Sequence, residues 1–317
     1  MILKSVFLPL MLLLSLSLLA EPAKRVYVSN EMADTVSVID MASQSVIDTL
    51  AVGDRPRGLG LSPDQQYLYV AVSNDDAIAV VDLQTLTVIK KLQVGNDPES
   101  FAVAPDGRLY VSNEELAQAS VIDPDENRVL ATVKVGIEPE GVAVSPDGSL
   151  AVVTSESSSQ IHAINTADYQ LVKNIRVAAR PRGLAFNGDG SVFYVTSEVG
   201  NEITMIDSRK LSVIKTTTVA VNNARPMGIV VSPDDNTLYV STGRGGMIAV
   251  LDAKTLEMKA KVAVGERVWG IDLSRDGRLL YTANGGSNTV SVVDTVSLDI
   301  VKTIEVGQLP WGLVIDD

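Results

Sequence analysis

The chain has 317 residues, a formal net charge of −13, 46% hydrophobic and 4% aromatic residues, one histidine and no cysteine. The lack of cysteine excludes disulfides, thiolate nucleophiles, zinc fingers, thiolate-bound iron–sulfur clusters and thioether-attached haem, and one histidine excludes a multi-histidine metal site. The acidic balance disfavours nonspecific nucleic-acid binding, which needs clustered lysine and arginine.

Residues 1–20 have the pattern of a secretory signal. Lys4 is their only charge, and an apolar run from Val6 to Leu19 precedes the return to polar chain. We therefore predict an exported protein, periplasmic or secreted, that is cleaved near Ala20 to leave residues 21–317. The run is short for a membrane span, so we expect no stable membrane insertion after cleavage. An uncleaved N-terminal anchor is the alternative.

A repeat of about 42 residues organises the rest of the chain. In each copy an aromatic residue, or Val152 in the fourth copy, is followed thirteen positions later by an Asp or Asn that ends a valine- and isoleucine-rich segment. The pairs are Tyr27 and Asp40, Tyr69 and Asp82, Tyr110 and Asp123, Val152 and Asn165, Tyr194 and Asp207, Tyr239 and Asp252, and Tyr281 and Asp294. The fifth copy carries three extra residues near Asn222 to Ala224.

Each copy contains four short, alternating segments separated by turn residues. In the second copy we predict strands at Gly58–Leu61, Tyr67–Val72, Ala77–Val81 and Val88–Val94. Four strands per repeat of this length are typical of a propeller blade, whose radial repetition leaves few exposed sheet edges.

The two ends of the repeat pattern predict how the ring closes. The first copy starts at a second strand, Arg25–Ser29, and the chain finishes after a first strand, Trp311–Ile315. We therefore predict an all-β, seven-bladed propeller of four-stranded antiparallel blades in one domain, with the last blade made of three N-terminal strands and the C-terminal strand. We expect a monomer.

Two polar features have structural interpretations. The repeated Asp or Asn at the end of each third strand is expected to accept backbone N–H bonds in the following turn, because seven copies in one register cannot all be catalytic. His162 lies in a predicted third strand with no titrating partner nearby in sequence. We therefore expect a hydrogen-bonded scaffold residue.

The repeats differ most where the chain enters each innermost strand. The tripeptides there are Arg55-Pro56-Arg57, Asp97-Pro98-Glu99, Glu138-Pro139-Glu140, Arg180-Pro181-Arg182, Arg225-Pro226-Met227, Arg267-Val268-Trp269 and Leu309-Pro310-Trp311. Innermost strands of a propeller line its channel, so these residues should ring the channel mouth. The only two tryptophans of the chain occupy one register in neighbouring repeats.

The loops between second and third strands should reach the same face. The candidate ligand or partner residues from both sets are Arg57, Glu99, Glu140, Arg182, Arg225, Met227, Arg267, Trp269, Trp311, Glu156, Glu198, Arg244 and Asn284. No catalytic residue and no metal ligand is predicted among them.

The ring has two interpretations. Large side chains and Arg–Glu pairs could fill the funnel as ordinary structure, or the ring could form a polar pocket with one aromatic wall that binds a ligand or partner loop. Carboxylates at Asp97, Glu99, Glu138 and Glu140 could also hold Ca²⁺ or Mg²⁺, although the flanking arginines would neutralise them.

The sequence resembles the YVTN-repeat β-propeller family. The motifs that carry the resemblance are Tyr27-Val28-Ser29-Asn30, Tyr110-Val111-Ser112-Asn113, Tyr194-Val195-Thr196-Ser197 and Tyr239-Val240-Ser241-Thr242. The segments Tyr281–Asn288 and Val306–Gly312 are similar to the subgroup associated with pyrroloquinoline quinone-dependent alcohol catabolism. That resemblance implies an exported accessory protein of a quinoprotein dehydrogenase system.

From these features we expect a binding protein rather than an enzyme, with a quinoprotein system or a small molecule as its partner. Pyrroloquinoline quinone and a divalent cation are the candidate cofactors. The enzyme alternative is a lactonase-like hydrolase that uses Glu or Asp with a divalent ion. Nucleic-acid or cell-envelope attachment is the third class, and it would need a basic face.

Overall fold

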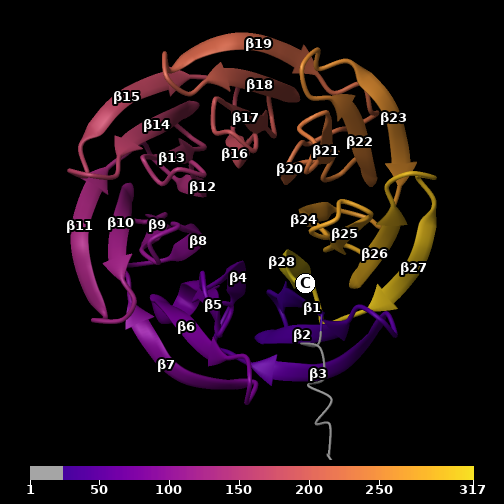
Figure 1. Cartoon of the computed structure of the whole chain (residues 1–317), viewed down its shortest axis with the longest axis horizontal. Helices are drawn as coiled ribbons and strands as arrows, with labels where there is room; N and C mark the ends of the chain where they lie inside the picture. Colours follow the sequence, from indigo (N-terminus) through magenta and orange to yellow (C-terminus); the bar gives the residue numbers. More distant parts are fainter. Residues whose placement is uncertain (1–23) are drawn as a thin grey trace, which may run out of the picture.

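The computed structural model describes residues 24–317. They form seven four-stranded antiparallel sheets arranged around a common axis (Figure 1). One 3-10 turn, Ser73–Asp75, is the only helical element among the described residues. The predicted seven-bladed propeller is thereby confirmed, whereas the predicted signal at residues 1–20 lies outside the described residues.

The blade that closes the ring combines both ends of the described chain, as predicted. From the axis outward its strands are β28 (Pro310–Asp316), β1 (Arg25–Asn30), β2 (Thr35–Asp40) and β3 (Ser45–Ala51). Arg25 pairs with Asp316 and Val28 with Leu313, so backbone hydrogen bonds join the ends of the ring.

The other six blades follow in chain order, each with its first strand nearest the axis (Figure 1). The second and third blades contain β4 (Pro56–Leu61), β5 (Tyr67–Val72), β6 (Ala77–Asp82), β7 (Thr87–Gln93), β8 (Pro98–Val103), β9 (Leu109–Asn113), β10 (Gln118–Asp123) and β11 (Arg128–Lys134). The fourth and fifth contain β12 (Pro139–Val144), β13 (Leu150–Ser155), β14 (Gln160–Asn165), β15 (Leu171–Arg176), β16 (Pro181–Phe186), β17 (Val192–Ser197), β18 (Glu202–Asp207) and β19 (Ser212–Thr218). The sixth and seventh contain β20 (Ile229–Val231), β21 (Thr237–Ser241), β22 (Met247–Asp252), β23 (Met258–Ala263), β24 (Val268–Leu273), β25 (Leu279–Asn284), β26 (Thr289–Asp294) and β27 (Ile300–Glu305).

The hydrophobic core lies between neighbouring blades rather than in one central mass. Tyr27 and Val38 of the closing blade, for example, share a buried cluster with Val70 and Ala79 of the next blade. Both faces of the two middle strands are buried, which explains their continuous valine and isoleucine content. The regular spacing of the repeat therefore places equivalent apolar side chains at the contact between each pair of neighbouring blades. No helix in the stretch from residue 24 to 317 is long and apolar enough to cross a membrane.

The predicted turn chemistry is confirmed. Asp82 accepts hydrogen bonds from the backbone N–H groups of Gln84 and Thr85, both at 2.9 Å. The side chains that make equivalent bonds in the other blades are Asp40, Asp123, Asn165, Asp207, Asp252 and Asp294. These six carboxylates and the Asn165 amide stabilise the turns at the face opposite the channel mouth.

His162 is a buried scaffold residue, as predicted. Its Nε2 accepts the backbone N–H of Gly136 at 2.9 Å, and its Nδ1 lies 2.7 Å from the side-chain oxygen of Asn174. Burial lowers the pKa of the imidazole, so the neutral ring donates through Nδ1 to the amide oxygen. Both ring nitrogens are thus used, one by the loop that leads into the fourth blade and one by a neighbouring strand of that blade.

Candidate functional site at the channel mouth

A β-bulge at the start of the innermost strand positions one candidate side chain per blade. In β4, Pro56 pairs with Val72 and Leu59 with Val70, so Arg57 and the following glycine oppose a single residue of β5. Bulges of this kind redirect a side chain out of the sheet register. The residues at the same place in the other regular blades are Glu99, Glu140, Arg182, Trp269 and Trp311.

Neighbouring innermost strands approach each other closely, which explains why the second residue of each bulge is small. A Cβ atom added at Gly270 would lie 2.8 Å from the backbone oxygen of Trp311, which is closer than real Cβ contacts. The neighbouring blades therefore bring Trp269 and Trp311 together through their backbones. Their rings are 5.8 Å apart at 85°, an edge-to-face pair.

The sixth blade departs from this pattern because the three extra residues of the fifth copy lie in the loop that leads into its innermost strand. They form a turn in which Ala224 N–H donates to the backbone oxygen of Val221. The innermost strand β20 is shortened to Ile229–Val231. Met227 is nevertheless held at the mouth, because its backbone N–H donates to the oxygen of Ser241 at 3.0 Å.

Two connected cavities lie at the mouth and directly below it. The outer cavity has a volume of about 300 Å³ and a mainly polar wall. The inner cavity has a volume of about 190 Å³ and is lined mostly by apolar groups. The two share Glu140, Arg182, Met227 and Trp269, so a molecule in the mouth has access to the apolar space beneath.

The cavities bring together most of the predicted site residues. Those in the outer cavity are Arg57, Glu140, Glu156, Arg182, Glu198, Arg225, Met227, Arg244, Arg267 and Trp269. Trp311 lines the inner cavity, whereas Glu99 and Asn284 line neither. Asn284 is fully buried, and its amide donates to Thr289 at 3.1 Å and Ser291 at 2.9 Å. Its hydrogen bonds thus lie within the seventh blade.

One cluster of ion pairs joins the first three blades. Glu31 accepts from Arg57 at 2.8 Å and from Arg55 at 3.3 Å. Arg55 also donates to Asp97 at 3.2 Å, and Arg57 forms an ion pair with Glu99. Glu99 is fully buried, so its charge depends on these arginines.

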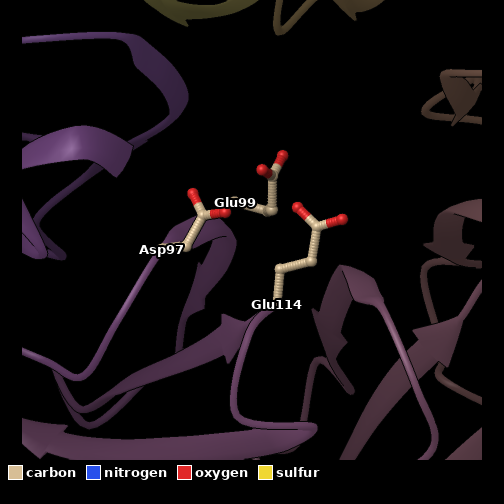
Figure 2. A group of neighbouring side chains, drawn as sticks. All are labelled: Asp97, Glu99 and Glu114. Carbon is tan, nitrogen blue, oxygen red and sulfur yellow. The ribbon is translucent and has the colours of Figure 1, made fainter.

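Three carboxylates of the third blade converge beside that cluster (Figure 2). Oxygen atoms of Asp97, Glu99 and Glu114 lie within 4.8 Å of one another. Burial raises the pKa of Asp97, and the nearby charge of Glu114 adds to the effect while Arg55 opposes it. Oxygen ligands at this spacing suit a hard divalent cation, but two of the three carboxylates already pair with arginine.

A second cluster joins the fourth and fifth blades. Arg182 donates to Glu140 at 2.7 Å and to Glu198 at 3.0 Å, and it lies 2.8 Å from Glu156. Burial, together with the charge of Glu140, raises the pKa of Glu156 to about 7. Burial alone would lower the pKa of Arg182, but the three carboxylates outweigh it and raise that pKa. Arg180 adds a further pair with Glu156.

The remaining arc of the mouth is cationic and aromatic. Arg225, Arg244 and Arg267 line the outer cavity, and within residues 24–317 their side chains form no ion pair and no hydrogen bond. The guanidinium of Arg267 lies 4.8 Å from the centre of the Trp269 ring, a cation–π distance. Arg57 approaches Trp311 in the same way at 5.7 Å.

The sequence interpretation missed Glu31, which binds both arginines of the second blade. Its signal was present in the repeat: Glu31 stands four residues after Tyr27, in the register that Glu114, Glu156 and Glu198 occupy in their own blades. This register marks the start of the loop between second and third strands. Comparing copies at that position would have identified it.

Comparison with known proteins agrees with the architecture. Residues 12–317 match the family described as YNCE-like beta-propeller. The chain belongs to the YNCE-like β-propeller family. No curated protein matches its sequence.

Solved structures similar to this YNCE-like propeller show the same fold in proteins of different kinds. It is similar to hydrazine synthase of Kuenenia stuttgartiensis at 24% identity and a TM-score of 0.78, covering 86% of this chain and 92% of that one. A functionally unknown protein of Desulfotomaculum acetoxidans is similar at 16% identity and a TM-score of 0.81, covering 92% and 99%. A protein of Bacteroides fragilis provisionally named a 6-phosphogluconolactonase is similar at 19% identity and a TM-score of 0.79, covering 94% and 99%.

Proposed function

We propose that this YNCE-like propeller is a binding protein whose channel mouth holds a ligand or a loop of a partner protein. The observation that carries the proposal is the tryptophan pair. Trp269 and Trp311 meet edge to face on an apolar cavity that opens into a polar mouth. Apolar cavities with a few convergent polar groups are typical of ligand sites, and half-buried tryptophan beside arginine is typical of binding hot spots.

We further propose that the protein acts beside a quinoprotein alcohol-oxidising system, in the periplasm or outside the cell. This part rests on the similarity of Tyr281–Asn288 and Val306–Gly312 to the subgroup associated with pyrroloquinoline quinone-dependent catabolism. Cell fractionation and N-terminal sequencing of the mature protein test the export, and size-exclusion chromatography tests the proposed monomer.

The binding proposal is tested with the variants Trp269→Ala and Trp311→Ala. We expect the wild type to retain a quinoprotein alcohol dehydrogenase or pyrroloquinoline quinone itself in calorimetry or pull-down, and both variants to bind at least about tenfold more weakly. Val296→Ala, at an exposed turn of the opposite face, is the matched control. Circular dichroism establishes folding of each variant. Unchanged binding by both tryptophan variants would exclude the mouth as the site.

A lactonase-like hydrolase is the second candidate, and the convergence of Asp97, Glu99 and Glu114 is the observation that favours it. An enzyme of this kind would need a divalent cation at the carboxylates and a water molecule that the cation activates. Metal-dependent turnover of a lactone panel, lost in Glu99→Gln or Glu140→Gln, would support the hydrolase over the binding protein.

A further inference from the structure

The arginines on the two sides of the mouth differ in whether they form ion pairs with carboxylates. Arg55, Arg57, Arg180 and Arg182 are each held by at least two carboxylates. The three arginines of the remaining arc have no acidic partner among the described residues. These three, Arg225, Arg244 and Arg267, will be called the free arginine arc.

A change at one repeat register explains the difference. Four blades carry glutamate at the start of the loop between second and third strands, but the sixth and seventh blades carry Gly243 and Gly285 there. Arg180 pairs with both Glu156 and Glu198, whereas Arg267, at the same repeat register, lies between the two glycine-bearing loops. The Arg267 backbone oxygen accepts from Gly285 N–H at 3.0 Å. The guanidinium groups of the free arginine arc therefore face the cavity without a counter-charge.

The space below the arc is apolar. Ile229, Ile271, Leu184 and both tryptophans line the inner cavity. An apolar cavity next to a few polar groups suits the apolar part of a small ligand.

We propose that the mouth binds a small aromatic anion, with its carboxylate or similar acidic group on the free arginine arc and its flat apolar body against Trp269 and Trp311. This inference deepens the proposed binding function and rests on it. Arginine forks bind carboxylates through paired, charge-assisted hydrogen bonds. The edge-to-face tryptophan pair offers an aromatic surface next to them.

The opposite side of the mouth fixes the orientation of such a ligand. Glu114, Glu140, Glu156 and Glu198 line the outer cavity across from the arc. The arginines on that side are already held by these and neighbouring carboxylates, so the acidic group of a ligand is favoured on the arc, where the guanidinium groups have no ion pair. The ligand is thus distinguished by where its charge lies as well as by its shape.

The test compares 2-naphthoate with 2-naphthamide, which has the same ring and nearly the same shape but no charge. By calorimetry at low salt we expect the wild type to bind the carboxylate about tenfold more tightly than the amide. The triple variant Arg225→Gln, Arg244→Gln, Arg267→Gln should lose this preference while still binding the amide. Arg209→Gln, at an exposed turn of the opposite face, is the matched control and should retain it.

The outcomes separate this inference from the proposed function. Equal affinity for the two probes, or an unchanged preference in the triple variant, overturns the anion site but leaves the mouth as a binding site. No binding of naphthoate to the wild type at millimolar concentration also overturns the inference. The proposed function itself fails only if Trp269→Ala and Trp311→Ala keep their quinoprotein or quinone binding. The single variants Arg244→Gln and Arg267→Gln, at exposed positions, give the same readout should the triple variant fold poorly.

Discussion

The mouth of this propeller contains two regions built on the same repeat registers. From the closing blade to the fifth blade, four arginines pair with six carboxylates and fill the funnel with ion pairs. In the sixth and seventh blades, glycine replaces glutamate at the start of the loop between second and third strands. Met227 of the sixth blade, Trp269 of the seventh and Trp311 of the closing blade occupy the register that holds a charged residue in the other four blades. The two interpretations of the ring, as a funnel filled by Arg–Glu pairs and as a polar pocket with an aromatic wall, therefore apply to one region each. A change of residue at two registers turns a packed ionic region into an open cationic pocket.

The largest expected effect comes from breaking the paired region. Arg182→Gln would leave Glu140 and Glu156 buried, and Glu198 half-buried, without the cation that they share, which should cost about 3–5 kcal/mol of unfolding free energy. Urea denaturation followed by circular dichroism measures this. The arginine side chain is 14% exposed, so solvent offers little compensation.

The free arginine arc supplies the control for that experiment. Arg244→Gln removes an exposed side chain that has no partner among residues 24–317, and it should change stability by less than about 0.5 kcal/mol. Equal losses from Arg182→Gln and Arg244→Gln would contradict the division of the mouth into a paired and an open region.

The surplus of carboxylates in the paired region should make stability depend on pH. Burial raises the pKa of Glu156 to about 7, and it does the same for Asp272 in the inner strand of the seventh blade. Because the folded state holds these protons more tightly than the unfolded chain, their contribution to stability is greatest at low pH and is lost as the pH rises through about 7. We expect the melting temperature to fall by several degrees between pH 5 and pH 8.

Two substitutions test which carboxyl group causes the fall in melting temperature. Glu156→Gln should remove the part that belongs to the mouth, and Asp272→Asn the part that belongs to the inner strand. Glu257→Gln, at an exposed carboxylate, is the control and should leave the slope unchanged. A slope that persists in the double variant Glu156→Gln, Asp272→Asn would refute this origin.

The smallest expected effect concerns the electrostatic potential at the tryptophan rings of the open region. Both tryptophans of the chain lie there, so intrinsic tryptophan fluorescence reports on this site alone. Because Arg267 lies over the Trp269 ring, iodide should quench the wild type about two- to fourfold more efficiently than Arg267→Gln at low salt. Neutral acrylamide should quench both proteins equally. Equal iodide quenching would show that the arginine does not set the potential at the rings.

The blade architecture and the closure of the ring were predictable from the amino-acid sequence. The repeat spacing, the alternation within each segment and the turn-capping Asp of each blade are local signals, because each depends on residues within one copy. The bulged residues, from Arg57 to Trp311, were likewise identifiable as a ring because the repeats place them in one register.

Which members of the ring are paired depends on contacts between blades and was not predictable from the sequence. Arg55 meets Asp97 from the next blade, and Arg182 meets Glu156 from the previous one, so each pair depends on how closely two blades approach at the axis. The same packing buries Asn284 within its blade and leaves Arg267 beside Trp269 without a carboxylate. The repeat sequence shows which side chains at the mouth are charged. Whether each charge is neutralised depends on distances between side chains of different copies, and the sequence of one copy does not determine these distances.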